Sequence, residues 1–470
     1  MSKPEEEDRN MEPTEKLAEF IVKAALSDVP KAGVHLAKQA FLDCIGVTLA
    51  GSTSPQARIV FELVKENGGQ PKAVIMGGGF RSSSPEAAWA NGNSGHALDY
   101  DDTNSLVMGH PSVFLVPTVM AIGEEKGIPG SEALEAYIIG LEAAARIGRG
   151  MTKGHYAKGW HATATIGTLG AAVAAGKILK LSADQTRMAL GIAASSAAGL
   201  RQNFGTMTKP LHAGNAARNG VLAAKLAQKG FTADRNILEA KFGFYSLFSK
   251  DNQYELEKAT EQLGQPFIVV SPGINLKPYP ACRRTHAAID AMLEVVKKQG
   301  FAAQDVDSVE VRVEPLTPQV LIHSNPRSGL EGKFSMEFCM AIAILNKQVG
   351  LGEFTDEKVL DPRTQELMKK VKMIPDPSLA SPGKSKDEEN NPSILSVKLK
   401  NGKEFNRRVD FPKGNPSVPL SQEELLLKYR DCAERVLSKK AVKESIDLVE
   451  NMENIKDLKI LANLLMGAKI

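Results

Sequence analysis

Hydrophobic residues recur with the period of an amphipathic helix over residues 13–50. The apolar positions of "TEKLAEFIVKAAL" share one helical face, and Thr14 is a candidate N-cap. The next segment, "PKAGVHLAKQAFLDCIGVTLAGS", keeps a helical pattern between Pro30, which opens it, and Gly51, which closes it. The chain is therefore expected to begin with helices.

Residues 83–250 also read as helices, and several of them are rich in alanine and glycine. In "ATATIGTLGAAVAAGKILK", glycine occurs at positions 167, 170 and 176. Glycine inside a helix costs about 1 kcal/mol relative to alanine, so its repeated use needs a reason. Close packing of helix backbones provides one, and we predict that these helices lie at the centre of the molecule.

The pattern changes near residue 273. "DSVEVRVEPL" alternates like a strand, and "SILSVKLKNGKEFNRRVDFPKG" predicts a hairpin with Asn401-Gly402 as a type I′ turn. Residues 381–393 are expected to form a solvated loop, and the chain is helical again to its end. We expect a mainly α protein with a disordered tail (1–12), a large all-α domain (13–272 and 413–470) and a smaller α+β domain (273–412).

Composition and charge narrow the function classes. The chain has 470 residues, of which 43% are hydrophobic and 24% charged, as in ordinary globular proteins, and no apolar run is long enough to cross a membrane. A net charge of +3 gives no reason to expect nucleic acid or a membrane surface as partner. The four cysteines are scattered and form no CxxC pair, which favours reduced thiols. With an acidic N-terminus that lacks a signal-peptide pattern, this predicts a cytoplasmic protein.

Four polar segments hold most of the eight histidines: "HALDYDDTNSLVMGHPS", "GHYAKGWHATATIG", "FGTMTKPLHAG" and "KPYPACRRTHAAIDA". In three of them a histidine opens a predicted helix: His161, His212 and His286. Helix N-termini attract anions, and lysine or arginine nearby adds charge-assisted hydrogen bonds. Each residue alone could be a cap, a solvated lysine or a surface pair. Their recurrence in one pattern favours a site for a small anionic substrate that bears a carboxylate.

A metal centre is the main alternative from the residues alone. Asp99, Asp101 and Asp102 could supply ligands together with His96 or His110. The sequence has no HxH or HExxH pair, and the lysine and arginine residues of the other segments would compete with a cation. We therefore predict no metal centre here, and we regard His96 as a structural residue.

With these segments placed, the sequence resembles the MmgE/PrpD family, which includes 2-methylcitrate dehydratases, cis-aconitate decarboxylases and iminodisuccinate epimerases. The resemblance runs from about residue 14 to 465 and is carried by "LDCIGVTLAG", "SPEAAWANGNSGHALDYDDT", "GHPS", "GWHATATIGTLGAAVAAGK", "MTKPLHAGNAARNGVLAAKLAQKGF" and "KPYPACRRTHAAID". It implies an all-α domain joined to a smaller α/β lid, an active site in the cleft between them, a homodimer and no cofactor.

The resemblance also implies a set of site residues. It places active-site positions on Asp99, Thr103, His110, His161, Lys209 and His286. We predict that Asp99, His110, His161, Lys209 and His286 are catalytic, and that the substrate contacts are Thr103, Asn104, His212, Arg283, Arg284 and His323. Three features depart from relatives: Asn104 stands where histidine is frequent, His323 takes the place of an aromatic lid residue, and the Arg283-Arg284 pair replaces small or apolar residues.

The reactions of this family share the handling of a proton on a carbon α to a carboxylate. Our hypothesis makes His110 and His161 the acid/base pair, with Asp99 orienting one of them. Lys209, His286 and Arg283 would bind substrate carboxylates. The expected protein is a cofactor-independent lyase that acts on a small anionic di- or tricarboxylate, either as a dehydratase or as a decarboxylase. An epimerase on the same scaffold is one alternative, and a carboxylate-binding protein without catalytic activity is another.

Overall fold

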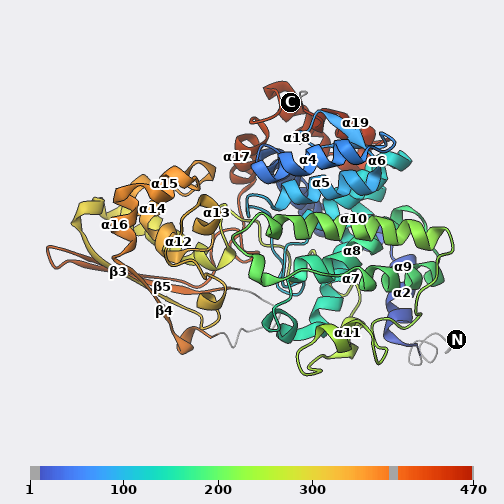
Figure 1. Cartoon of the computed structure of the whole chain (residues 1–470), viewed down its shortest axis with the longest axis horizontal. Coiled ribbons are helices and arrows are strands. Elements are labelled where there is room, and N and C mark those ends of the chain that lie inside the picture. Colours follow the sequence, from blue (N-terminus) through green and yellow to red (C-terminus); the bar gives the residue numbers. More distant parts are fainter. Residues whose placement is uncertain (1–10, 381–389, 468–470) are drawn as a thin grey trace.

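A computed structural model describes residues 11–380 and 390–467 of the chain. It shows a large helical body and a smaller α/β body beside it (Figure 1). The predicted fold class, mainly α with a smaller α/β part, is confirmed. The expected tail lies almost wholly outside the described residues, and so does most of the expected loop at 381–393.

The first 250 residues supply most of the helical body, as the hydrophobic pattern predicted. Pro30 and Gly51 bound the second helix as expected, but Thr14 is no N-cap. The first helix begins at Pro13, and the Thr14 hydroxyl donates a hydrogen bond to Glu239. The helices of this part are α2 (Pro13–Lys23), α3 (Lys31–Gly51), α4 (Pro55–Asn67), α5 (Ser84–His96), α6 (Ser112–Lys126), α7 (Gly130–Ala157), α8 (Ala162–Ile178), α9 (Ala183–Ser195), α10 (Thr208–Gln228) and α11 (Phe244–Phe248).

The glycine-rich helices α8 and α10 lie at the centre of this body, and α10 packs closely against both α5 and α8. A Cβ atom added to Gly220 of α10 would lie 2.4 Å from the Cβ of Ala171 in α8. One added to Gly170 would lie 2.8 Å from the Cβ of Ala144 in α7. These distances are too short for a side chain, so the predicted close approach of the helix backbones is confirmed.

The α/β body is built on a four-stranded sheet of order β4-β3-β5-β6. β3 (Val306–Val313) pairs antiparallel with β5 (Ser393–Leu399), and β5 pairs antiparallel with β6 (Glu404–Val409). The predicted hairpin is thus confirmed, but its turn has three residues, and of these Gly402 alone has a positive φ, of 84°. β4 (Val371–Pro375) pairs parallel with β3, in register Val309↔Val371. A two-stranded hairpin, β1 (Ala73–Ile75) and β2 (Phe80–Ser82), lies in the helical body.

Helices cover one face of this sheet because its strands alternate. In β3 the buried residues are Val306, Val309, Val311 and Val313, whereas the residues between them are more exposed. α12 packs on β5 and β6, and α14 packs on β4. The helices of this body are α12 (His286–Gln299), α13 (Gly329–Gly332), α14 (Met336–Asn346), α15 (Asp356–Leu360) and α16 (Pro362–Met368).

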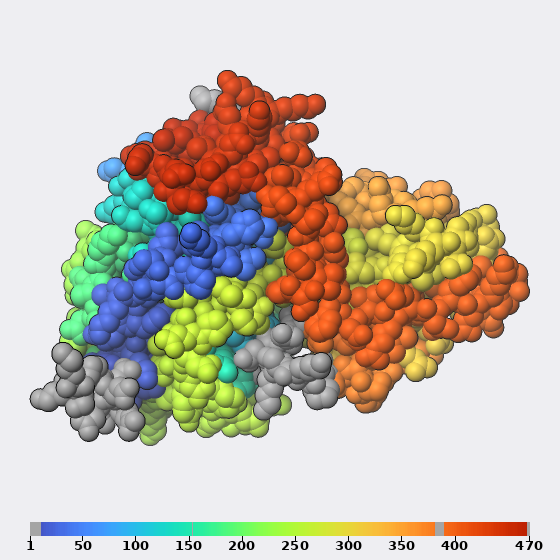
Figure 2. Space-filling view, turned by 180° about the vertical axis from the view of Figure 1, so that it is seen from behind, coloured from blue at the N-terminus to red at the C-terminus, as the bar shows by residue number. Residues whose placement is uncertain are grey.

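The last helices return to the helical body. They are α17 (Gln422–Ala433), α18 (Lys439–Glu450) and α19 (Lys459–Leu465), and Figure 2 shows this red segment spread over the blue N-terminal helices. Tyr429 of α17 packs directly against Gly46 of α3. The two largest hydrophobic cores of the described residues follow the same division, and this supports our proposal of domain boundaries near 272 and 413. None of the described helices combines the length and apolarity that crossing a membrane requires.

Candidate active site

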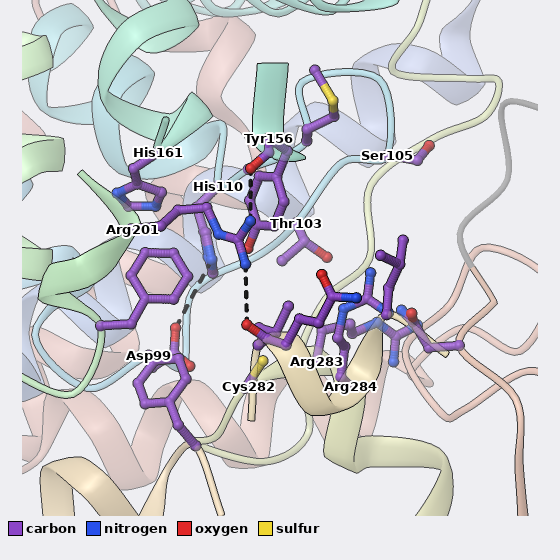
Figure 3. A pocket seen from close by; sticks show the side chains of 18 of the residues that line it. Asp99, Thr103, Ser105, His110, Tyr156, His161, Arg201, Cys282, Arg283 and Arg284 are labelled. Atoms are coloured by element: carbon purple, nitrogen blue, oxygen red, sulfur yellow. Dashed lines mark hydrogen bonds and ion pairs between the residues drawn. The ribbon is translucent and has the colours of Figure 1, made fainter. Parts of the chain in front are cut away.

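A cavity of about 230 Å³ lies where the two bodies meet (Figure 3). Asp99, Thr103, His110, His161 and Lys209 line it from the helical body, and Arg283 and Arg284 line it from the start of the α/β body. Seven of the eleven predicted site residues therefore share one cavity. Their placement agrees with the cleft that the family resemblance implies.

Helix starts bring these residues together. His161 is the N-cap of α8, and Lys209 is the second residue of α10. His110 lies two residues before α6, and Arg283 begins the short 3-10 helix (Arg283–Thr285) that leads into α12. Since unpaired N–H groups and the helix dipole favour negative charge at a helix N-terminus, this convergence suits an anionic ligand.

The extended segment between the two bodies is fixed against the first polar segment. Thr103 and Asn275 exchange backbone hydrogen bonds of 3.0 and 2.8 Å, and Tyr100 donates to the carbonyl of Pro278. This pairing brings Lys277 to the cavity wall. Lys277 belongs to the motif "KPYPACRR", but the sequence gives no sign that its side chain reaches the site.

Asp99 is the buried carboxylate of the cavity that contacts two lysines. Its Oδ1 lies 2.6 Å from Nζ of Lys209 and 3.2 Å from Nζ of Lys277. Burial alone would raise the pKa of Asp99, but these two ammonium groups outweigh it and hold the pKa far below its usual value. The backbone of Asp99 is left-handed, with φ of 50°, a strained conformation of the kind that is concentrated at functional sites. Asp99 therefore stays ionised and positions the two lysines.

Asp101, rather than Asp99, is the carboxylate that contacts histidine closely. Its Oδ2 lies 2.9 Å from Nδ1 of His110 and 2.8 Å from Nδ1 of His96, whereas Asp99 Oδ1 is 3.9 Å from Nε2 of His110. Burial opposes ionisation, but the close contacts with His110 and His96 keep the pKa of Asp101 well below its usual value. The sequence did not single out Asp101 as an orienting group.

His96 has the structural position expected of it. It is fully buried, its ring stacks on that of His161 at 5.7 Å, and it meets the ring of His110 edge-on at 4.5 Å. Burial lowers its pKa to about 3, so it is neutral at physiological pH. It packs between the two histidines that line the cavity.

His161 and His212 share a hydrogen bond between their Nδ1 atoms, 3.0 Å apart. One ring must donate and the other accept, so the pair cannot carry a second Nδ1 proton without losing this bond. Burial lowers the pKa of His161 well below its usual value and that of His212 to about 4. Both imidazoles are thus neutral at pH 7. His212 lies behind His161 and does not line the cavity.

Three further predicted residues are not on the cavity wall. Asn104 is buried, donates to the carbonyl of Gly273 and accepts from two backbone N–H groups, so it organises the loop before His110. His286 is buried, and its Nε2 lies 3.1 Å from the carbonyl oxygen of Ala281. His323 is half-buried, with Nε2 3.4 Å from the carbonyl oxygen of Phe204.

The residues considered for a metal site do lie close together. His96, Asp99, Asp101 and His110 each offer a ligand atom, and these atoms lie within 4.8 Å of one another. However, Asp99 already contacts the ammonium groups of Lys209 and Lys277, and both imidazoles contact Asp101. Two fixed positive charges beside the cluster oppose a divalent cation, so this donor set suits an anionic ligand better than a metal.

Comparison with known proteins agrees with this architecture. The chain matches the sequence model of the MmgE/PrpD N-terminal domain over residues 15–257 and that of the MmgE/PrpD C-terminal domain over residues 279–454. The chain belongs to the MmgE/PrpD family.

The curated relatives include two kinds of lyase. The chain is 29% identical to a cis-aconitate decarboxylase of Mus musculus over 97% of its own length and 94% of that protein. It is 29% identical to a cis-aconitate decarboxylase of Homo sapiens, with 92% and 90% covered. Identity to a mitochondrial 2-methylcitrate dehydratase of Yarrowia lipolytica is 23%, with 81% and 76% covered.

Proposed function

We propose that this protein is a cofactor-independent lyase that acts on a di- or tricarboxylic acid, as a decarboxylase or a dehydratase. The observation that carries the proposal is the convergence of neutral imidazoles and ammonium groups on one cavity between the two bodies. The names of the curated relatives, cis-aconitate decarboxylase and 2-methylcitrate dehydratase, support the reaction class.

In this mechanism Lys209 and Lys277 hold a substrate carboxylate. Each ammonium group has three N–H donors, and Asp99 uses only part of them. The Thr103 hydroxyl lines the same wall, and its oxygen is buried without a hydrogen-bond partner among the described residues. It is placed to bond the bound carboxylate. Fixed positive charge at this point also stabilises the enolate-like charge that develops when the α-carbon gains or loses a proton.

The two cavity histidines divide the proton transfer. The Asp101 carboxylate stabilises the imidazolium that forms when His110 accepts a proton, so His110 is the principal proton carrier. His161 has no such counter-ion and a strongly lowered pKa. It acts as a neutral partner that donates to the substrate or exchanges a proton through His212. Asp101 and His212 are positioning residues in this scheme.

Proton NMR of the purified full chain with cis-aconitate, 2-methylcitrate and aminodicarboxylates in D₂O tests the reaction class. A decarboxylase or dehydratase yields a product that has lost CO₂ or water. An unchanged skeleton that gains deuterium would indicate an epimerase instead. Stabilisation of the fold by these acids without turnover of any would indicate a binding protein.

The homodimer and the cytoplasmic location are also proposals. Exposed apolar side chains on α10 (Leu222 and Leu226) and just after it (Phe231) support a self-association surface. Light scattering after size exclusion should give twice the chain mass. The four free cysteines support a reducing compartment.

A further inference from the structure

The cavity carries more positive charge than the proposed chemistry uses. Among the described residues that line it, five are lysine or arginine and only two are carboxylates, which leaves a surplus of three positive charges. Lys209 and Lys277 lie against Asp99, and Arg284 donates to Glu314 at 2.8 Å. Arg201 forms no ion pair with a described residue, and the sequence pattern did not mark it as a site residue.

Arg201 is held in place by neutral groups. Its Nη1 donates to the carbonyl of Tyr156 at 2.6 Å, and its Nη2 donates to the carbonyl of Gln319 at 3.2 Å (Figure 3). The guanidinium carbon lies 3.9 Å from the centre of the Tyr156 ring. These contacts orient the planar group without neutralising its charge, and two of its five N–H groups are used.

The position of Arg201 relative to the proton-handling groups is fixed by the backbone. Arg201 N–H donates to Gly159 at 2.9 Å, and His161 N–H donates to Gly199 at 3.0 Å. This short antiparallel bridge sets Arg201 next to the segment that presents His161. Tyr156 belongs to α7 and Gln319 to the α/β body, so Arg201 lies where the two bodies meet. It is also less buried than Lys209 and Lys277.

We propose that Arg201 forms a distal anion subsite that binds the third carboxylate of a tricarboxylic acid, beyond the carboxylates held at Lys209, Lys277 and Arg283. The inference rests on the proposed function, because it assumes that the substrate reacts at the end of the cavity where Lys209 and Lys277 lie. A guanidinium binds a carboxylate through charge-assisted hydrogen bonds, and a group already oriented by its neighbours loses little entropy on doing so. Arg283 and Arg284 line the same cavity and add to its positive potential.

Calorimetric titration with propane-1,2,3-tricarboxylate and with glutarate tests the subsite, since the two acids share a carbon chain and differ by one carboxylate. In the wild type the tricarboxylate should bind at least about tenfold tighter. Arg201→Gln should weaken the tricarboxylate roughly 10- to 100-fold and change glutarate less than about threefold. Arg312→Gln removes an exposed arginine of β3 and should match the wild type.

An unchanged ratio of the two affinities in folded Arg201→Gln would overturn the proposal. If that variant does not fold, Arg201→Lys tests the proposal instead, because lysine keeps the positive charge but lacks the planar guanidinium group. Its preference for the tricarboxylate should fall, and an undiminished preference would overturn the proposal. A wild type that shows the preference but turns over no acid would refute the lyase and leave the subsite standing. A wild type that binds neither acid would refute both.

Discussion

Oδ2 of Asp101 lies 2.9 Å from Nδ1 of His110, and the same oxygen lies 2.8 Å from Nδ1 of His96. One buried carboxylate thus fixes the ring that faces the cavity and anchors it to a second ring behind. The arrangement supports our proposal that Asp101 is the positioning residue for proton transfer, whereas Asp99 contacts the lysines.

Asp101→Asn should lower kcat roughly 10²- to 10⁴-fold with a much smaller change in KM, because the imidazolium of His110 loses its counter-ion. The Asp101 charge raises the pKa of His110 against burial, which lowers it. The acid limb of the pH–rate profile should therefore move to lower pH in the variant. Steady-state kinetics between pH 5 and 9 would measure both effects.

Asp431→Asn is the matched control, since Asp431 is an exposed carboxylate of α17. It should leave kcat and the profile unchanged. A kcat of Asp101→Asn within about threefold of the wild type would refute the positioning role, because general acid–base catalysis contributes at least about 10²-fold.

Buried neutral histidines should make the fold sensitive to acid. Burial lowers the pKa of His96 to about 3 and those of His155 and His212 to about 4, below the unfolded value near 6.5. The unfolded chain takes up protons first as pH falls, so the free energy of unfolding should decrease progressively below about pH 6.5. Each group contributes a slope of up to about 1.4 kcal/mol per pH unit.

His155 isolates this effect from activity, because it lies outside the cavity and contacts Phe248 and Thr165. Denaturant unfolding at pH 7.5, 6 and 5 should show a shallower loss of stability in His155→Gln than in the wild type. Equal slopes in the two proteins would show that His155 is not kept neutral by the fold.

The glycine at the crossing of α8 and α10 should tolerate no side chain. Gly220→Ala places a methyl group 2.4 Å from the Cβ of Ala171. Separating the two helices should lower the free energy of unfolding by about 1–3 kcal/mol. Gly352→Ala is the control, since its Cβ would meet no atom within 4 Å. Stability of Gly220→Ala equal to that of the control would contradict the close approach of the two helices.

The sequence predicted the elements whose pattern is local. Period-3.6 and period-2 patterns located the helices and the strands β3, β5 and β6, and the repeated glycines indicated the central helices. β4 was missed because it is a short strand at the sheet edge, ends at Pro375 and has little alternation of its own. It exists because β3 offers it a parallel partner 62 residues away, in register Val309↔Val371.

The same distinction holds for the site. The presence of His161 and Lys209 in the cavity could be predicted, because the sequence around each residue shows where a helix begins. Asp101 and Arg201 could not, because the roles that we propose for them depend on tertiary contacts. Asp101 contacts rings brought to it by α5 and the loop before α6, and Arg201 is oriented by carbonyl groups from both bodies.

The central claim is that His110 and Lys209 act on a carboxylic acid in the cavity between the two bodies. The most direct measurement is proton NMR of turnover by His110→Ala and Lys209→Ala on the acid that the wild type converts, with His35→Ala and Lys440→Ala as exposed controls. We predict that each cavity variant loses at least about 100-fold in kcat/KM and that the controls match the wild type. Wild-type turnover by both cavity variants would contradict the account.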